Sequence, residues 1–301
     1  MHVRNHRGSL CSTSASNHYK MSKLRNSTMA DWEVDPSRGA DSDECNMLGG
    51  WLGPLPRLPS GASLQITCAP ALSSTGGVLW PSAPALCERL LALLDDEHAS
   101  PSDADAIELG AGTGCVGLFA AALGARVVLT DGGFPSGSEQ AVRQLEHLRA
   151  NVRLNAGVLA GGVRVMELDW SVPEHCDAVL ASGPAHKFDL VLGSDITFEH
   201  SMHPAIASAI ARLLRPRHGG GQGGTALISY TTRHLNAKGR DVDIVRFMAH
   251  ASAKGLRVIS PPLETTFQGH VGICILRHAI PADELGYKGS EDDPDIFDLL
   301  R

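Results

Sequence analysis

The sequence predicts an α/β fold with a doubly wound, mostly parallel sheet of seven strands and an antiparallel last strand. Three observations predict this fold. Short apolar runs alternate with longer stretches of helical periodicity through most of the chain. A glycine-rich turn follows the first apolar run and opens a helix. The last two apolar runs are separated by a short loop without a helix, and such a loop joins antiparallel neighbours.

The alternating region supplies each element in order. A strand followed by a helix and another strand forms a right-handed βαβ unit, which makes the strands parallel. The strands are expected at residues 106–109, 126–130, 163–168, 188–192, 225–230, 256–259 and 271–277. The helices are expected at residues 117–123, 139–154, 205–214 and 242–253.

The two ends of the chain differ in composition from this region. Residues 1–45 are basic and rich in Ser and Thr at first, then acidic, and they show no apolar period. We expect a disordered N-terminal extension there, with an organelle transit peptide as the alternative. Residues 281–301 contain seven acidic residues and are expected to form an acidic C-terminal tail. The folded domain is therefore predicted to span residues 46–280.

Composition excludes several classes of function. The net charge is −7 and aromatic residues make up 5% of the chain, which argues against a nucleic-acid binder. No apolar run reaches the ~18 to 20 residues of a membrane helix, so we expect no membrane contact. The seven cysteines are scattered without a CxxC pair, which predicts no metal site and a reducing compartment. We expect a monomer in the cytoplasm, with the nucleus as an alternative.

The strongest local signal is the sequence ELGAGTG at residues 108–114, where an apolar strand enters a glycine-rich turn. Glycines let the backbone curl tightly and approach a ligand. Asp131 follows Gly110 by 21 residues and ends the second strand, where its carboxylate can accept both hydroxyls of a ribose. The ligand stays open at this point, because Gly112, Gly114 and Gly117 also fit the dinucleotide pattern GxGxxG. The negative charge of Glu108 favours a ligand with an amino group and a sulfonium over a pyrophosphate.

Four stretches together resemble a known family. They are GGVLWPSA at 76–83, ELGAGTG at 108–114, LDW at 168–170 and LGSDITF at 192–198. In this order they resemble the seven-β-strand methyltransferases, and within them the protein-lysine methyltransferase branch of methyltransferase-like proteins grouped as family 16. The resemblance covers roughly residues 60–278. It implies a Rossmann-like methyltransferase fold, S-adenosylmethionine as cofactor and a lysine of a protein substrate as methyl acceptor.

The resemblance also implies roles for individual residues in binding the cofactor. Glu108, Gly110, Gly112 and Thr113 are expected to hold the methionine part, with Trp80 packed near the same end. Asp131 is expected to bind the ribose. Asp169 and Trp170 are expected to hold the adenine through its exocyclic amine and its ring face. Ser194 lies with them at the carboxyl edge of the sheet, where open α/β sheets bind ligands.

The acceptor end departs from the family pattern Asp-x-x-Tyr. This chain has Asp195 and Phe198, and phenylalanine keeps the ring but lacks the hydroxyl. We expect Asp195 and Phe198 to act in catalysis, with Asp195 and Glu199 orienting a cationic side chain. The alternative for Glu199 is to cap the following helix.

Several alternatives remain open on the sequence alone. His200 and His203 are candidates for contacts at the rim of the site. The missing hydroxyl leaves arginine or a small molecule as alternative acceptors. It also leaves a cofactor-binding partner protein without turnover. An NAD-dependent oxidoreductase rests on GxGxxG alone.

Overall fold

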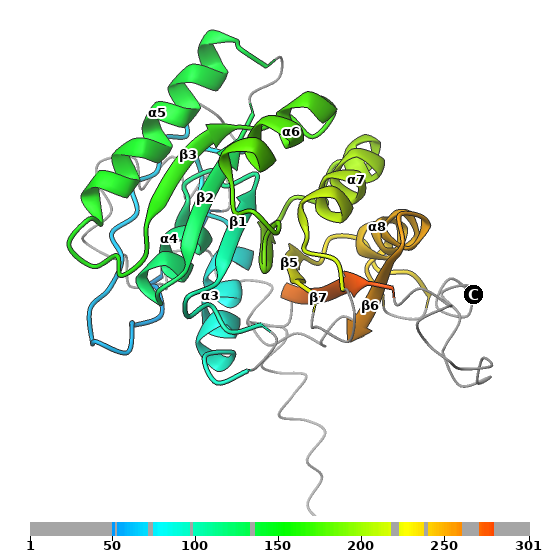
Figure 1. Ribbon diagram of the computed structural model, residues 1–301, viewed down its shortest axis with the longest axis horizontal. Helices are drawn as coiled ribbons and strands as arrows, with labels where there is room; N and C mark the ends of the chain where they lie inside the picture. Colours follow the sequence, from blue (N-terminus) through cyan, green and yellow to red (C-terminus); the bar gives the residue numbers. More distant parts are fainter. Residues whose placement is uncertain are drawn as a thin grey trace, which may run out of the picture.

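The computed structural model describes residues 50–279 except 52, 72–74, 97–98, 133–135, 218–222, 238–239 and 261–270. Both terminal segments predicted from composition, 1–45 and 281–301, lie outside the described residues, so the predicted domain boundaries stay predictions. Figure 1 shows the described part as one sheet with helices on both of its faces.

Seven strands form a single sheet in the order β3-β2-β1-β4-β5-β7-β6. The strands β1 to β5 pair in parallel, and β7 runs antiparallel to both β5 and β6. This arrangement confirms the predicted fold class, including the antiparallel last strand. The strands are β1 Asp105–Leu109, β2 Arg126–Asp131, β3 Val163–Glu167, β4 Leu190–Ser194, β5 Thr225–Thr231, β6 Leu256–Ser260 and β7 Val271–His278.

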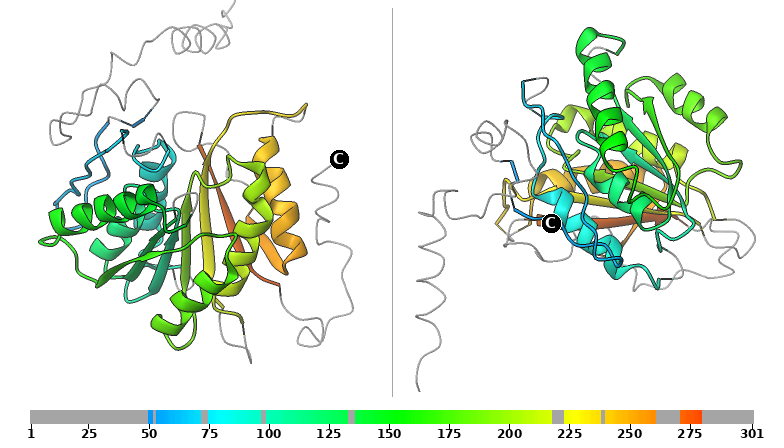
Figure 2. Two further views of the ribbon diagram at one scale, coloured as in Figure 1. Left: turned by 90° about the horizontal axis from the view of Figure 1, so that it is seen from above. Right: turned by 90° about the vertical axis from the view of Figure 1, so that its left-hand side faces the viewer.

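The helices form two layers, one on each face of the sheet (Figure 2). Side chains of α3, α4 and α5 belong to the hydrophobic core of one face, and those of α6, α7 and α8 to the core of the other. The predicted helices are confirmed, whereas α3 and α6 are additional. The bounds are α3 Ser82–Ala92, α4 Cys115–Ala122, α5 Glu139–Leu154, α6 Pro173–Ser182, α7 His203–Leu213 and α8 Val242–Ala253, with the short 3₁₀ helix η2 at His200–Met202.

The central strand β1 is buried along its whole length, because helices cover both of its faces. Ala106 belongs to one hydrophobic core, while Ile107 and Leu109 belong to the other. Glu108 lies between them with 1% of its surface exposed. Ionised carboxyl groups are almost never buried to this extent without a partner, so β1 places an unusual group at the carboxyl end of the sheet.

Amide side chains on α5 and at its C-cap fix the segment around residues 65–67, which precedes α3. Asn155 donates to the carbonyl of Gln65 (2.7 Å) and accepts from its N–H (2.8 Å). Asn151 pairs in the same way with Thr67 (3.1 Å for both bonds) and also donates to the carbonyl of Thr113 (2.9 Å). One buried side chain therefore joins this segment to the glycine-rich turn.

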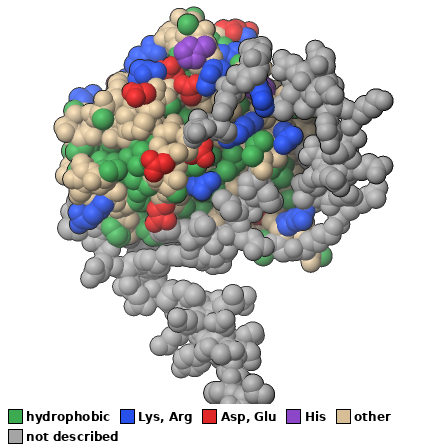
Figure 3. Space-filling view, turned by 60° about the horizontal axis from the view of Figure 1, so that its bottom comes forward, with side chains coloured by type: hydrophobic (Ala, Val, Ile, Leu, Met, Phe, Trp, Pro, Cys, Tyr) green, Lys and Arg blue, Asp and Glu red, His purple; other side chains and the backbone are tan. Residues whose placement is uncertain are grey.

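None of the helices in the described part of the chain is long and apolar enough to cross a lipid bilayer. On the face shown in Figure 3, the described acidic and basic side chains are interspersed among apolar ones.

Candidate functional site

A cavity of about 570 Å³ opens at the carboxyl ends of the parallel strands. The strand ends of β1, β2 and β4 contribute to it, together with the segments that follow β3 and precede α3. Parallel strands bring their carboxyl ends to one edge, which is where ligands bind in open α/β sheets. All eleven residues predicted for the site line this cavity: Trp80, Glu108, Gly110, Gly112, Thr113, Asp131, Asp169, Trp170, Ser194, Asp195 and Phe198. Their individual roles stay predictions.

The glycine-rich turn needs glycine for two separate reasons. Gly110 and Gly112 have φ values of 59° and 54°, in the left-handed region that side chains disfavour. A Cβ atom on Gly112 would also lie 2.9 Å from the carbonyl oxygen of Gly76, and one on Gly110 would lie 2.8 Å from the ring of Trp170. The turn therefore packs its backbone directly against two other walls of the cavity.

Glu108 is held at the base of the cavity. Its Oε2 accepts a hydrogen bond from the N–H of Gly117 at 2.8 Å, in the first turns of α4. Burial raises the pKa of Glu108 to about 8, against the lowering effect of that hydrogen bond. A positively charged ligand in the cavity would favour the ionised form, so the site suits a cation at this end.

Asp131 joins the glycine-rich turn to the end of β2. Its two oxygens accept from the N–H groups of Gly112 (2.7 Å) and Gly132 (2.9 Å). Burial raises the pKa of the Asp131 carboxyl, and the two backbone donors act in the opposite direction. A carboxylate has about four acceptor positions, so each oxygen retains one for a ligand hydroxyl.

Gln144 on α5 is a cavity residue that the sequence reasoning missed. Its Nε2 donates to the carbonyls of Gly112 (2.8 Å) and Gly76 (3.2 Å), which links the turn to the segment before α3. The buried Oε1 of Gln144 accepts no hydrogen bond from the described residues. Its spacing from Leu148 and Asn151 places this amide on the buried face of a helix, and that pattern is the signal in the sequence.

The segment after β3 forms another wall of the cavity. Oδ1 of Asp169 accepts from the N–H (2.8 Å) and hydroxyl (2.6 Å) of Ser171, and the N–H of Asp169 donates to Nδ1 of His175 (3.0 Å). The indole N–H of Trp170 is buried and finds no acceptor in the described part of the chain. An aromatic face beside a carboxylate and an unpaired donor fits a flat, nitrogen-containing ring system.

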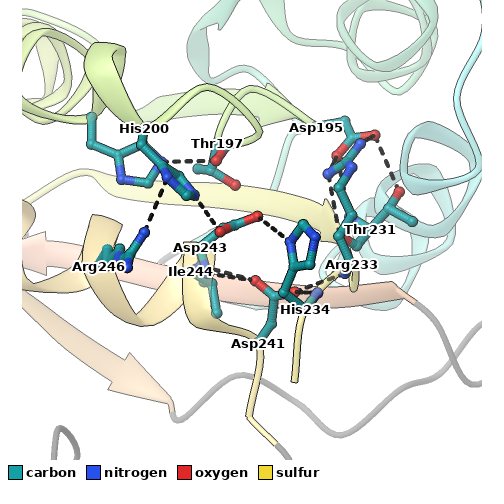
Figure 4. A network of polar contacts seen from close by, with 11 residues as sticks. Asp195, Thr197, His200, Thr231, Arg233, His234, Asp241, Asp243, Ile244 and Arg246 are labelled. Carbon is teal, nitrogen blue, oxygen red and sulfur yellow. Dashed lines mark hydrogen bonds and ion pairs between the residues drawn. The ribbon is translucent and has the colours of Figure 1, made fainter. Parts of the chain in front are cut away.

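Asp195 lies at the other end of the cavity, but its carboxylate is already paired (Figure 4). Arg233 donates to both of its oxygens at 2.9 and 2.8 Å. Thr231 donates to the same two oxygens from its N–H (3.2 Å) and its hydroxyl (3.1 Å). The expectation that Asp195 itself orients a cationic side chain is corrected here, because these four bonds fill the acceptor positions of the carboxylate.

Two further side chains define the same end. Phe198 is 46% exposed at the cavity, and Cζ of Arg233 lies 6.0 Å from the centre of its ring. The hydroxyl of Ser194 contacts that of Ser82 at 2.9 Å, which joins the end of β4 to the start of α3. The aromatic ring of Phe198 thus lines the cavity as predicted, and it lies beside the guanidinium of Arg233.

The residues after Phe198 begin the next helical segment, and Glu199, Ser201 and Met202 among them also line the cavity. Oε1 of Glu199 accepts from the N–H (3.2 Å) and hydroxyl (2.9 Å) of Ser201, so the capping alternative for Glu199 is confirmed. His203 is 1% exposed and contacts the carbonyl of Thr197 at 2.8 Å, and burial lowers its pKa. His200 pairs with Asp243. Neither histidine lines the cavity, so their expected rim contacts are wrong.

Comparison with known families identifies the family to which the chain belongs. The sequence model of the lysine methyltransferase family matches residues 61–240, which is more than half of the chain. The chain belongs to the lysine methyltransferase family. The matched range includes the strands β1 to β5, and the carboxyl ends of β1, β2 and β4 line the cavity.

Other members of this family resemble the chain at moderate identity. Protein N-lysine methyltransferase METTL21A from Danio rerio is 37% identical over 139 residues, covering 45% of this chain and 54% of that protein. EEF1A lysine methyltransferase 3 from Mus musculus is 32% identical over 141 residues, covering 47% of this chain and 51% of that protein. The chain thus spans about half the length of the curated relatives it matches.

Solved structures resemble this lysine methyltransferase family member more distantly. Magnesium protoporphyrin IX methyltransferase from Synechocystis PCC 6803 is 13% identical, with a TM-score of 0.43, over 65% of this chain and 79% of that chain.

Proposed function

We propose that this chain transfers a methyl group from S-adenosylmethionine to lysine side chains of a protein substrate. The family match over residues 61–240 is the observation that carries this proposal. The cavity supports it, because its residues suit the three chemical parts of that cofactor.

The fit can be followed part by part. Glu108 and the glycine-rich turn offer a buried carboxylate and backbone donors to the amino-acid part and its positive charge. Asp131 offers its remaining acceptor positions to ribose hydroxyls. Asp169 and Trp170 offer an acceptor and a ring face to the adenine. The chemistry of these residues therefore supports S-adenosylmethionine as the ligand of the cavity.

S-adenosylmethionine, when bound, supplies a methyl group on a sulfonium, which is an electrophile with a good leaving group. The chain's own contribution is positioning: it aligns an acceptor amine with that methyl group and excludes water. Phe198 and Met202 line the acceptor end with apolar surface, which favours an uncharged amine. Hydrogen bonds from Ser201 lower the pKa of Glu199 and make it a weak base, so we expect the proton that a lysine ammonium must lose to pass to water at the open end of the cavity.

The test is methyl transfer from tritiated S-adenosylmethionine to proteins of a cell extract. The labelled proteins are hydrolysed and their amino acids separated, which distinguishes methyllysine from methylarginine and from small-molecule products. We expect label in methyllysine with the wild type and a large loss with Asp131→Ala. Binding of the cofactor without label in any product would contradict the proposal and leave a partner protein without turnover.

Two further properties of the protein stay predictions. The sequence favours a monomer in the cytoplasm. Light scattering during size-exclusion chromatography measures the mass in solution, and a fluorescent fusion of the full chain shows the compartment. A dimeric mass or an organellar signal would contradict them.

A further inference from the structure

The carboxylate of Asp195 has its hydrogen-bonding capacity filled from inside the protein. Arg233 contacts both oxygens through two parallel N–H groups, and Thr231 adds a bond to each oxygen. Asp195 is 5% exposed, whereas the side chain of Arg233 is 33% exposed, so the carboxylate is shielded from water while the guanidinium is partly in contact with it. A buried carboxylate with a bidentate arginine is electrically neutral and well satisfied.

The backbone conformation of Asp195 is fixed by contacts with the neighbouring strand. Asp195 has a φ of 56°, a left-handed conformation that is uncommon for a residue with a side chain. Its N–H donates to the carbonyl of Ser229 at 2.8 Å, which continues the pairing between β4 and β5. The strained position persists because neighbouring contacts hold it, as is typical of functional sites.

Arg233 is itself held in place by the start of α8. Asp241 caps that helix and also accepts from the N–H groups of Arg233 (2.8 Å) and His234 (3.3 Å). Asp243 pairs with His200 and His234 nearby (Figure 4). The charged groups around the guanidinium are thus Asp195, Asp241 and Asp243, together with the imidazoles of His200 and His234.

The acceptor end consequently offers little to a cation. The carboxylates Glu108, Asp131 and Asp169 line the part of the cavity assigned to the cofactor. The oxygens of Asp195 already accept hydrogen bonds from Arg233. Glu199 remains, in contact with solvent, and one of its oxygens is used by Ser201. A guanidinium stays charged at every accessible pH and needs a carboxylate, whereas an amine can shed its proton.

From these contacts we infer that Arg233 is a positioning residue that sets acceptor specificity, an inference that rests on the proposed methyl transfer. Because Arg233 occupies the acceptor positions of the Asp195 carboxylate, the acceptor end binds a neutral amine and excludes a guanidinium. Without Arg233, Asp195 would become a free buried carboxylate that binds cations, ammonium and guanidinium alike.

The test uses two small probes with the same chain length, n-butylamine and n-butylguanidine. Each is titrated by nuclear magnetic resonance into the full chain saturated with S-adenosylhomocysteine, from about pH 7 to about pH 9, around which an amine begins to lose its proton. The variants are Arg233→Gln and, as a milder change that keeps the arginine, Thr231→Val. Arg143→Gln is the matched control, because Arg143 is exposed on α5 and pairs only with the exposed Glu139 among the described acidic residues.

We expect the wild type and Arg143→Gln to bind butylamine about tenfold more tightly for each unit of rising pH, and to bind no butylguanidine. Arg233→Gln should bind butylguanidine and should bind butylamine near pH 7 at least about tenfold more tightly than the wild type. Thr231→Val should change in the same direction by less. A purely structural role of Arg233 predicts no gain of butylguanidine binding in either variant.

Equal binding of butylguanidine by the wild type and Arg233→Gln would overturn the inference. So would the same pH dependence of butylamine binding in these two proteins, or the absence of probe binding to every variant. If Arg233→Gln does not fold, an unchanged Thr231→Val overturns it as well. Failure of the wild type to bind S-adenosylhomocysteine would instead contradict the proposed function.

Discussion

Glu108 shows how a single buried side chain links stability to ligand charge. Its pKa of about 8 in the folded chain lies above its ordinary value, so the native state holds a proton that the unfolded state has released. Between the two pKa values, stability falls as pH rises, by at most about 1.4 kcal/mol per pH unit. Above the pKa of Glu108 in the folded chain, the full loss of folding stability from burying its charge is present.

Glu108→Gln should remove this pH dependence, because an amide oxygen still accepts from the N–H of Gly117 and carries no charge. Denaturant unfolding of the ligand-free chain near pH 6, 7 and 8 measures the effect. The variant should gain stability relative to the wild type as pH rises and should lose cofactor affinity. Glu146→Gln, an exposed change on α5, is the control. Parallel stability curves for Glu108→Gln and the wild type would contradict this explanation.

Asp131→Ala should weaken cofactor binding by on the order of 1 to 3 kcal/mol, through the lost ribose contact. The same change removes the acceptor for the N–H groups of Gly112 and Gly132, so the turn is loosened as well. Isothermal titration calorimetry measures the affinity. Asp177→Ala, on the exposed side of α6, should leave it unchanged. An unaltered affinity for Asp131→Ala would show that the carboxylate does not contact the ligand.

At the scale of secondary structure, α5 does more than cover the sheet. Gln144 and Asn151 on its buried face and Asn155 at its C-cap are buried amides that bind backbone groups of other segments. Buried amides are costly unless their groups are paired, so their presence on this face indicates fixed partners. The helix therefore anchors both the extended segment near residue 65 and the glycine-rich turn.

Asn151→Ala should lower the free energy of unfolding by on the order of 2 to 4 kcal/mol, because it leaves groups of Thr67 and Thr113 without their partner. Chemical denaturation measures this change. Arg149→Ala, at an exposed position of the same helix, should have an effect within about 0.5 kcal/mol. Equal stability of the two variants would show that the extended segment is held by other contacts.

The sequence predicted the strands and amphipathic helices because their periodicity is local. It missed α3, whose residues follow Trp80 and Pro81 in a stretch interpreted as a motif, and which is buried on most sides. It also missed α6, a short helix of mixed composition in which only Cys176 and Val179 are buried. With only two buried residues, α6 lacks the broad apolar stripe that makes a helix recognisable.

At the scale of the molecule, the sheet topology explains why the site could be predicted in outline. Parallel strands deliver Glu108, Asp131, Asp169 and Ser194 to one edge, so motifs far apart in the sequence meet there. The pairing of Asp195 with Arg233 could not be predicted in this way, because the partners are 38 residues apart and meet only through the register of β4 and β5. The spacing of Gln144 marks it as buried on α5, but its partners Gly76 and Gly112 depend on how α5 packs against the sheet.

The central claim is that the cavity at the carboxyl edge binds S-adenosylmethionine, and calorimetric titration of the full chain with this cofactor tests it most directly. We predict saturable binding with one molecule per chain, strongly weakened by Asp131→Ala, and no heat with NAD. Absence of binding, or binding of NAD in its place, would contradict the account.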